Sequence, residues 1–422
     1  MNCLRSLAST PIFSTSRQTG TLALLAGLTL GASGGDWPQW RGPQRTGISS
    51  EKGWTTTFPV DGPKVLWTAK VGKGYSAISV AGGKAYTLGN DGKQDTIYGF
   101  DAVTGREVWK HSYPHPLDAK YYPGGSSGTP TVDGNRVYVL SRRGHLHCLD
   151  AATGAVVWQT NVATDLGAKV PEWGFASSVL IDGDRAVVNV GTHGAALDKA
   201  TGKVIWKTGK GEPGYSTPLP FEQNGQKLYL VFSAKELVAI KADSGQVVWS
   251  QKWVTSYDVN AADPIVVGPN RIFIATGYDR GGALLDVSGA KPNIVWENKN
   301  LRTQLNAAVL IGDYLYAIDG DTGKGQLRCV DVATGAAKWA FPETKHGALT
   351  ASDGHLIVIS EKGELMVGEA TPVAFKPVAR AQVGGGTYWT TPVLANGRLY
   401  LRNGDGQVTC LDLGATKVAS AR

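Results

Sequence analysis

Short apolar runs separated by glycine-containing turns make up most of the chain from Val65 onward. The segment that ends at Trp158 shows this pattern. Its apolar runs occupy residues 128–132, 136–140, 145–149 and 155–158. The turns between them include Asp133-Gly134 and Thr153-Gly154, where glycine tolerates the positive φ that a tight hairpin requires. No stretch of helical period follows the N-terminal region, so the pattern predicts four-stranded antiparallel sheets built from hairpins.

The four-strand unit repeats, and its well-formed copies end in a tryptophan. From Cys148 to Trp158 the sequence reads as a strand end, an Asp-x-x-Thr-Gly turn and a second short strand. The tryptophans at the equivalent position stand 42 to 49 residues apart and are Trp67, Trp109, Trp158, Trp206, Trp249, Trp296 and Trp339. A period of about 40–50 residues with four short strands is typical of a β-propeller blade. We expect each tryptophan to fill the gap between neighbouring blades.

The number of copies predicts how the ring closes. After Trp339 one further unit occupies 346–380 without a tryptophan, and a last unit at 388–412 has three strands. A fourth strand for it is available at 64–68, and pairing there removes the exposed edges that a propeller must otherwise protect. We therefore predict an all-β fold, an eight-bladed β-propeller of four-stranded antiparallel blades over 64–412, closed by an N-terminal strand.

The N-terminal region predicts export. An apolar run at 21–30 is followed by small residues at 31–35, which is typical of a secretory signal peptide over 1–35 with cleavage near Gly34. The run is shorter than the ~20 residues of a spanning helix. We expect an exported protein, periplasmic or extracellular, whose mature chain does not span a membrane. An uncleaved anchor is the alternative.

Two other segments flank the ring. Residues 36–63 contain four Pro and four Gly without alternation, and we interpret them as an irregular arm laid over the folded body and pinned by Trp37 and Trp40. Residues 413–422 form a C-terminal tail.

Composition and charge narrow the class of partner. Gly accounts for 55 of 422 residues and charged residues for 18%, against an average of about 25% charged. Lys and Arg are scattered, so the net charge of +7 indicates a solvated surface and excludes a nucleic-acid partner. We expect a monomer. Cys148, Cys329 and Cys410 share one repeat position in non-adjacent units, too far apart for a disulfide, and are predicted to be buried free thiols.

These residues carry a family resemblance over 64–412. The Asp-x-x-Thr-Gly turn that leads to Trp resembles the tryptophan-docking repeat of the pyrroloquinoline-quinone (PQQ)-like β-propeller family. That superfamily includes the quinoprotein alcohol dehydrogenases and the propeller lipoprotein of the outer-membrane β-barrel assembly machinery. The opening Trp37-Pro38-Gln39-Trp40-Arg41-Gly42 is similar to that of secreted bacterial members.

Candidate ligand-binding residues precede the first strand of each unit, where the chain approaches the propeller axis. They are Tyr75, Ser127, Trp173, Tyr215, Asn260, Asn306, His346 and Trp389. A ring rich in aromatic and amide groups at a channel mouth could hold a flat ligand or a peptide segment. The alternative is that these side chains only pack the axis.

The resemblance also implies a cofactor to consider. PQQ dehydrogenases clamp PQQ beneath a disulfide of adjacent cysteines, bind Ca²⁺ with Glu, Asn and Asp, and use an Asp as base. This sequence has no adjacent Cys pair, and its acidic residues do not match that set one by one. We expect no cofactor, no metal and no catalytic residue, and a binding or scaffolding module for protein or cell-envelope partners. The alternative is a quinoprotein-like oxidoreductase with PQQ and Ca²⁺ at the channel mouth.

Four other motifs are interpreted as structural. Residues 124–128 match G-x-S-x-G and 209–214 match G-x-G-x-x-G, but neither precedes a helix. His145 and His147 share a strand face and could bind a metal, and 319–325 has calcium-like oxygen spacing without a closing Glu. An ordinary strand face and a long hairpin turn are the favoured interpretations.

Overall fold

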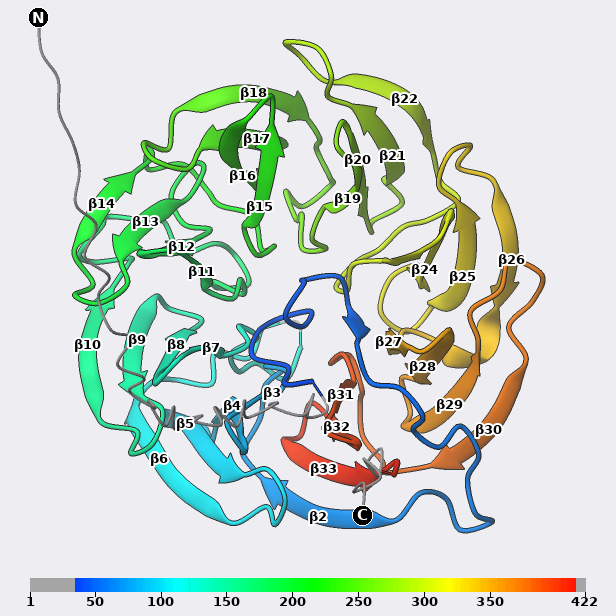
Figure 1. Ribbon diagram of the computed structural model, residues 1–422. Helices are drawn as coiled ribbons and strands as arrows, with labels where there is room; N and C mark the ends of the chain where they lie inside the picture. Colours follow the sequence, from blue (N-terminus) through cyan, green and yellow to red (C-terminus); the bar gives the residue numbers. More distant parts are fainter. Residues whose placement is uncertain (1–34, 121, 415–422) are drawn as a thin grey trace, which may run out of the picture. The chain divides into compact units, whose positions relative to one another are not determined.

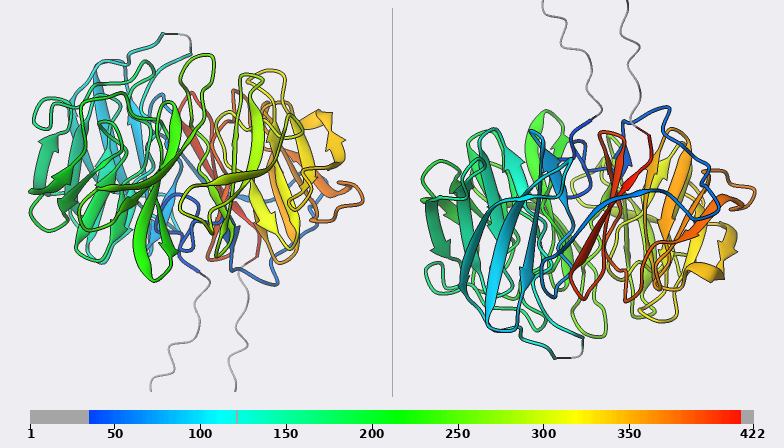
Figure 2. Two further views of the ribbon diagram at one scale, coloured as in Figure 1. Left: turned by 90° about the horizontal axis from the view of Figure 1, so that it is seen from above. Right: turned by 90° about the horizontal axis from the view of Figure 1, so that it is seen from below.

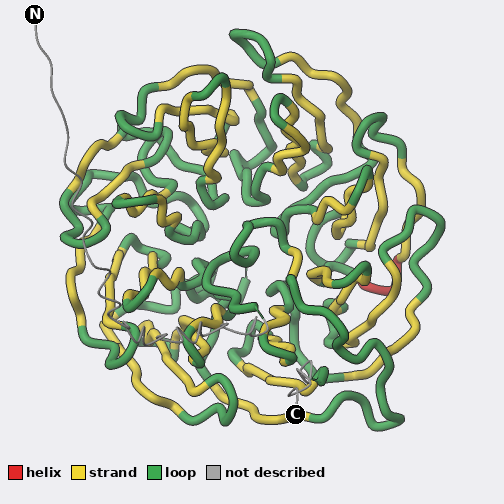
Figure 3. Tube along the Cα trace, viewed as in Figure 1, coloured by secondary structure: helices red, strands yellow, loops and turns green. Residues whose placement is uncertain are grey.

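Short antiparallel sheets arranged around a central axis form the fold (Figure 1). The computed structural model describes residues 35–120 and 122–414, and within them the strands form eight sheets, seven of four strands and one of five. Loops and turns connect nearly all strands directly (Figure 3). In the described part of the chain the one helix is the 3-10 turn η1 (Pro342–Thr344). The predicted all-β, eight-bladed propeller is confirmed.

Each blade runs outward from the axis in chain order. Blades 1 and 2 contain β3 (Ser79–Ala81), β4 (Lys84–Asn90), β5 (Gln94–Asp101) and β6 (Glu107–Pro114), then β7 (Thr131–Asp133), β8 (Arg136–Leu140), β9 (His145–Asp150) and β10 (Val156–Asn161). Blades 3 and 4 contain β11 (Leu180–Asp182), β12 (Arg185–Val188), β13 (Ala195–Asp198) and β14 (Val204–Lys207), then β15 (Leu219–Gln223), β16 (Gln226–Phe232), β17 (Glu236–Lys241) and β18 (Val247–Lys252).

The second half repeats this order. Blades 5 and 6 contain β19 (Ile265–Gly268), β20 (Arg271–Thr276), β21 (Gly281–Asp286) and β22 (Asn293–Asn298), then β23 (Val309–Ile311), β24 (Tyr314–Asp319), β25 (Gln326–Asp331) and β26 (Ala337–Phe341). Blade 7 contains β27 (Ala348–Ser352), β28 (His355–Ile359), β29 (Glu364–Glu369) and β30 (Pro377–Gln382), and blade 8 contains β31 (Val393–Ala395), β32 (Arg398–Arg402), β33 (Gln407–Asp412) and β2 (Val65–Lys70).

Strand β2 closes the ring as predicted. It pairs antiparallel with β33, with Trp67 opposite Cys410 and Ala69 opposite Val408. The outer strand of blade 8 therefore comes from the start of the propeller sequence, and the last strand is held between two neighbours.

The repeat tryptophans lie in the seams between blades. Trp109 donates its Nε1–H to the Ala151 carbonyl of the next blade at 3.0 Å, and its ring lies over Gly154, where an added Cβ would approach the ring to 2.5 Å. Equivalent bonds of 2.8–3.2 Å to the next blade come from Trp67, Trp158, Trp206, Trp296 and Trp339. Each such seam is closed by ring packing and one satisfied indole donor.

Two seams depart from the repeat. Trp249 donates to Gln223 Oε1 at 2.8 Å, and Gln223 Nε2 in turn donates to the Val287 carbonyl of the next blade. In blade 7 the tryptophan position holds Ala379, opposite Val367. Trp54 of the arm packs instead with Ala379 and Val367 of blade 7 and Leu411 of blade 8. Phe375 lies in the preceding seam, between blades 6 and 7, where it stacks on Trp339 at 6.2 Å.

The arm over 36–63 is more ordered than predicted. Its strand β1 (Ile48–Ser49) pairs parallel with β27 and makes blade 7 five-stranded, a pairing that the sequence did not predict. Trp37 is buried and exchanges backbone hydrogen bonds of 2.8 Å with Val80. Bonds to distant blades replace internal periodicity here, which is why the local sequence gave no strand signal. The arm lies on one face of the propeller, dark blue in Figure 2.

Cys148, Cys329 and Cys410 are free and buried, as predicted. Cys148 and Cys410 lie opposite Tyr138 and Tyr400 on neighbouring strands. Burial raises the pKa of the Cys148 thiol to about 11, so it stays protonated and unreactive.

The predicted signal peptide and C-terminal tail fall largely outside the described residues. None of the helices in the part of the chain that the structure describes is long and apolar enough to cross a membrane.

Candidate binding site at the propeller axis

A cavity of about 360 Å³ lies at the axis of the ring. Its wall is contributed by the arm, by the connections that precede the innermost strands, and by the β20–β21 and β24–β25 hairpins. It is lined by Trp40, Tyr75, Tyr122, Ser127, Trp173, Ala176, Ser178, Tyr215, Thr217, Val259, Ala261, Asp263, Tyr278, Gln304, Leu305, Asn306, Thr322, Trp389 and Thr390. A volume of this size is ordinary for a small-molecule site.

The structure brings six of the eight candidate residues together on this wall. They are Tyr75, Ser127, Trp173, Tyr215, Asn306 and Trp389. Their role in ligand binding stays a prediction.

Asn260 and His346 are not on the wall. Asn260 is fully buried and donates to the carbonyls of Ser233, Ala234 and Trp253, while its neighbours Val259 and Ala261 line the cavity. Successive side chains of extended backbone point to opposite sides. The alignment of the repeat units was shifted by one residue here, so it selected Asn260 in place of a neighbour that faces the cavity. His346 is 1% exposed and lies behind Trp389, edge to face at 6.3 Å.

Aromatic rings from separate blades face the cavity. Tyr75 stacks on Trp389 with centroids 4.9 Å apart, which joins blades 1 and 8. Trp173 meets Tyr215 edge to face at 6.3 Å on the side of blades 3 and 4. Tyr278 enters from the β20–β21 hairpin of blade 5. The rings thus surround the space instead of forming one flat platform.

The arm closes one end of the cavity with Trp40. Its Nε1 donates to Asp263 Oδ2 at 2.6 Å, and the Thr217 backbone N–H donates to Asp263 Oδ1 at 2.8 Å. Trp40 and Asp263 also line a second hollow of only about 10 Å³. Burial raises the pKa of Asp263, although nearby Arg41 opposes this. Asp263 is the one charged side chain among the described residues of the cavity wall.

Arg41 fixes this floor from behind. Its guanidinium donates to the carbonyls of Ala307 at 3.2 Å and Ala308 at 2.7 Å. It is 6% exposed and does not line the cavity. The segment that supplies Trp40 is therefore anchored to the chain that precedes β23 of blade 6, next to the blade that carries Asp263.

The amide side chains of the wall are engaged in internal bonds. Gln304 accepts from the Thr322 backbone N–H at 2.7 Å and donates to the Tyr278 hydroxyl at 3.2 Å. Asn306 donates to the Trp389 carbonyl at 2.9 Å. Such bonds hold the aromatic rings in place before any ligand arrives.

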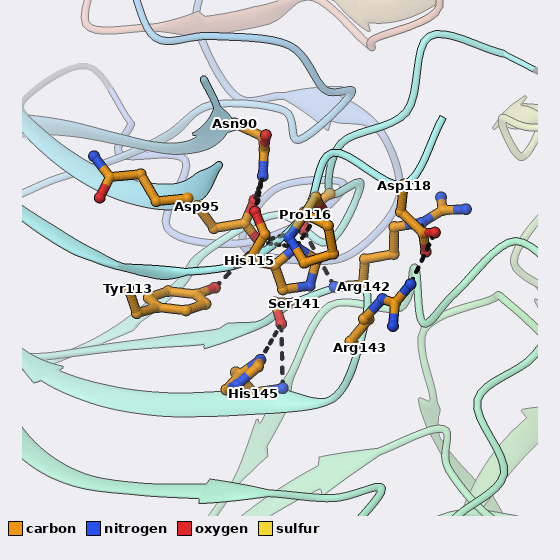
Figure 4. A network of polar contacts seen from close by, with 12 residues as sticks. Asn90, Asp95, Tyr113, His115, Pro116, Asp118, Ser141, Arg142, Arg143 and His145 are labelled. Atoms are coloured by element: carbon orange, nitrogen blue, oxygen red, sulfur yellow. Dashed lines mark hydrogen bonds and ion pairs between the residues drawn. The ribbon is translucent and has the colours of Figure 1, made fainter. Parts of the chain in front are cut away.

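A buried polar network around Asp95 and His115 (Figure 4) lies beside the connection between β6 and β7, which carries Tyr122 and Ser127. Asp95 accepts from Asn90 Nδ2 at 2.7 Å and from Ser126 Oγ at 2.9 Å. The Ser126 carbonyl in turn accepts from the Tyr75 backbone N–H at 3.0 Å. This connection between β6 and β7, cyan in Figure 2, projects from the face opposite the arm.

Four of the seven histidines gather beside this network. They are His111, His115, His145 and His147, from blades 1 and 2, with ring centroids 5.1–6.4 Å apart for the close pairs. Desolvation lowers the pKa of His147 to about 3 and also lowers those of His111 and His145. Within 35–120 and 122–414 no group of three or more His, Cys, Asp or Glu side chains is placed to hold a metal ion. The cluster is a feature of the seam.

Comparison with known proteins places the fold in a family. The profile described as "Outer membrane protein assembly factor BamB" matches residues 93–341 and 324–418 in two overlapping segments. The chain belongs to the BamB family. Its repeat is the PQQ-like repeat that the sequence indicated.

Solved structures agree with this assignment at the level of the fold. BamB of Moraxella catarrhalis aligns with a TM-score of 0.63 and 17% identity over 83% of this chain and 99% of that one. A quinohemoprotein alcohol dehydrogenase of Comamonas testosteroni aligns at 0.68 and 14% over 93% and 82%. A second such enzyme, ADHIIG of Pseudomonas putida HK5, aligns at 0.63 and 15% over 91% and 81%. A sequence search of curated proteins finds no match.

The residues of this BamB-family cavity do not fit PQQ with Ca²⁺. PQQ is a polyanionic carboxylate, and the described wall carries Asp263 but no Lys or Arg. Glu and Asp side chains for a calcium site are not gathered among the described residues, and the sequence holds no adjacent Cys pair. A buried anion without a cationic partner is strongly disfavoured.

Proposed function

We propose that the protein is a non-catalytic, exported binding module whose ligand occupies the axial cavity. The observation that carries the proposal is an aromatic cavity held open by internal hydrogen bonds, with no nucleophile–base pair among its described lining residues. A site that binds without reacting requires complementary walls and nothing more. An oxidoreductase would also require a redox cofactor, and the wall does not fit PQQ.

Export and the class of partner belong to the same proposal. The N-terminal signal-like sequence supports export to the periplasm or the extracellular space. The family description names a factor in outer membrane protein assembly, and this supports a scaffold for protein or envelope partners. The cavity then adds a ligand-dependent site to that scaffold.

A cavity-filling variant tests the proposal. Ser127→Trp places a large ring in the cavity at a side chain without a hydrogen-bond partner among the described residues, and Ser250→Trp adds the same ring to the exposed outer strand β18. A panel of cationic, neutral and anionic small molecules is screened by thermal shift and tryptophan fluorescence. We expect saturable binding to the parent and to Ser250→Trp, and its loss in Ser127→Trp.

Two results would contradict the proposal. If no compound distinguished the parent from Ser127→Trp, the cavity would not be a ligand site. If PQQ with Ca²⁺ stayed bound through gel filtration and the loaded protein oxidised alcohols with an artificial electron acceptor, the quinoprotein alternative would replace it.

A further inference from the structure

The charge of the cavity wall selects among ligand classes. Seven aromatic side chains of the described residues line it, and they are Trp40, Tyr75, Tyr122, Trp173, Tyr215, Tyr278 and Trp389. The faces of such rings carry negative electrostatic potential and attract cations within about 6 Å of the ring centre. Asp263 adds a carboxylate to the floor of the same space. Both features favour a positive ligand.

Carboxylates on the protein side of the aromatic rings also favour a positively charged ligand. Glu361 Oε1 accepts from Trp389 Nε1 at 3.0 Å, and Asp321 Oδ1 accepts from the Tyr278 backbone N–H at 2.8 Å. One carboxylate thus bonds the Trp389 ring and another bonds the backbone of Tyr278, and Asp405 lies near Tyr75. An indole that donates to a carboxylate has a more electron-rich face.

The cations near the cavity are turned away from it. Arg41 donates to four backbone carbonyls, of which Thr46 at 2.9 Å and Arg45 at 3.1 Å belong to the arm. Arg402 is 1% exposed and donates to the carbonyls of Ser76 and Leu88. Arg142 pairs with Asp118 at 3.0 Å behind Tyr122. None of the three lines the cavity. Arg142 is paired with a carboxylate, and the N–H groups of Arg41 and Arg402 point to backbone carbonyls and not into the cavity.

The hydrogen-bond state of the wall narrows the kind of cation. A primary ammonium brings three N–H donors, and each must find an acceptor or lose its hydration without compensation. The Gln304 and Asn306 oxygens already accept internal bonds, from the Thr322 N–H and the Thr391 hydroxyl. A quaternary ammonium group has no N–H and offers methyl groups to the rings, so its transfer leaves no donor unpaired.

We propose that the axial cavity binds a small quaternary ammonium compound, with its cationic head between the Tyr75–Trp389 and Trp173–Tyr215 pairs and its charge facing Asp263. This rests on the proposed function, because it assigns a ligand class to that same cavity. The floor formed by Trp40 limits how deep the head can enter.

The test compares choline with its uncharged carbon analogue, in which a tert-butyl group replaces the trimethylammonium group. The two heads have the same shape and differ in charge. Isothermal titration of the purified full protein at low ionic strength should give a dissociation constant at least about tenfold lower for choline. Equal affinity for both would overturn the inference.

Two variants at one position locate the effect. Trp173→Phe keeps an aromatic face, and Trp173→Leu keeps an apolar side chain without one. We expect Trp173→Phe to retain most of the preference for choline and Trp173→Leu to lose it, with melting temperatures recorded to show that both fold. A preference for choline that survives Trp173→Leu unchanged would contradict the assigned position.

Failure of the inference is distinguishable from failure of the proposed function. If a neutral or anionic compound of the panel binds the parent but not Ser127→Trp, while choline does not bind, the cavity is a ligand site for another class. If no compound is sensitive to Ser127→Trp, the proposed function fails as well.

Discussion

Tryptophans in the seams and aromatic rings at the axis are chemically alike but have opposite surroundings. Trp158 in a seam is 9% exposed, donates to the Lys199 carbonyl at 2.9 Å and covers Gly202. Trp173 at the axis is half-buried and faces a cavity. Seam rings lie on regular outer strands, whereas axial rings lie on connections, on a hairpin turn and on the arm. The position of the ring in the blade, more than its type, decides whether it stabilises the fold or presents a binding face.

The largest loss of stability is expected when the strand that closes the ring is deleted. Deleting residues 64–68 takes away most of β2, its pairing with β33 and the Trp67 seam. We expect the variant not to fold stably, because blade 8 would expose an edge and the ring would open. Circular dichroism during thermal unfolding measures this, and a melting temperature equal to the parent's would refute closure by β2. Replacing the exposed turn at 59–62 by Gly and Ser is the control.

A matched pair of substitutions sharpens the comparison itself. Trp158→Ala should lower the free energy of unfolding by about 3–5 kcal/mol, because it leaves a cavity in a closed seam and an unpaired carbonyl. Trp173→Ala should lower it by about 1 kcal/mol or less, because one ring face already borders open space. Urea unfolding gives both values. Equal losses would mean that the axial rings are core residues and not a binding surface.

The same contrast explains what could be predicted from the sequence. The seams repeat one interaction at a fixed period, so seven tryptophans were enough to predict eight blades and the closing strand. Trp54 was missed because it reaches the seam between blades 7 and 8 from the arm and not from the tryptophan position of the repeat.

The axis does not repeat, and there the prediction was incomplete. Trp40 and Asp263 lie 223 positions apart in sequence and meet through the arm, which has no period to align. Tyr122 and Tyr278 lie in connections of unequal length, so no register placed them. Asn260 was an error of one residue in an extended segment, where one step reverses the side chain.

A smaller effect is expected at the seam between blades 1 and 2. His111, His145 and His147 have pKa values below the usual 6.5 because burial disfavours their charged form, and His147 falls to about 3. In the unfolded chain they take up protons below about pH 6.5, whereas the folded state resists this. Stability from this group is therefore fully present above pH 6.5 and is lost as pH falls toward the folded pKa.

For His147 alone the loss between pH 7 and pH 5 is about 2 kcal/mol. Urea unfolding of the parent and of His147→Gln at both pH values measures it. The variant should show a flatter pH dependence, and His355→Gln, outside the cluster at the start of β28, serves as the matched control. An identical pH dependence in parent and His147→Gln would show that protonation of His147 does not destabilise the folded state.

The smallest expected effect is a pH dependence of choline affinity, which reports on Asp263 at the axis and not on the stability of the seams. Burial raises the pKa of Asp263 above that of an ordinary carboxyl, and a cation binds to its ionised form. Affinity for choline, which has no group that titrates in this range, should be constant near neutral pH. It should then weaken as pH falls toward the raised pKa, by up to about tenfold.

Asp263→Asn should bind more weakly at neutral pH and show no such decline, because its amide does not titrate. Titrations of both proteins between pH 7.5 and about pH 5, with folding checked by circular dichroism at each pH, measure the two profiles. If both proteins lost affinity in parallel, Asp263 would not be the group that titrates. The decline would then come from the histidines between blades 1 and 2, whose protonation would disturb the neighbouring Asp95 network and the Tyr122 loop that it supports.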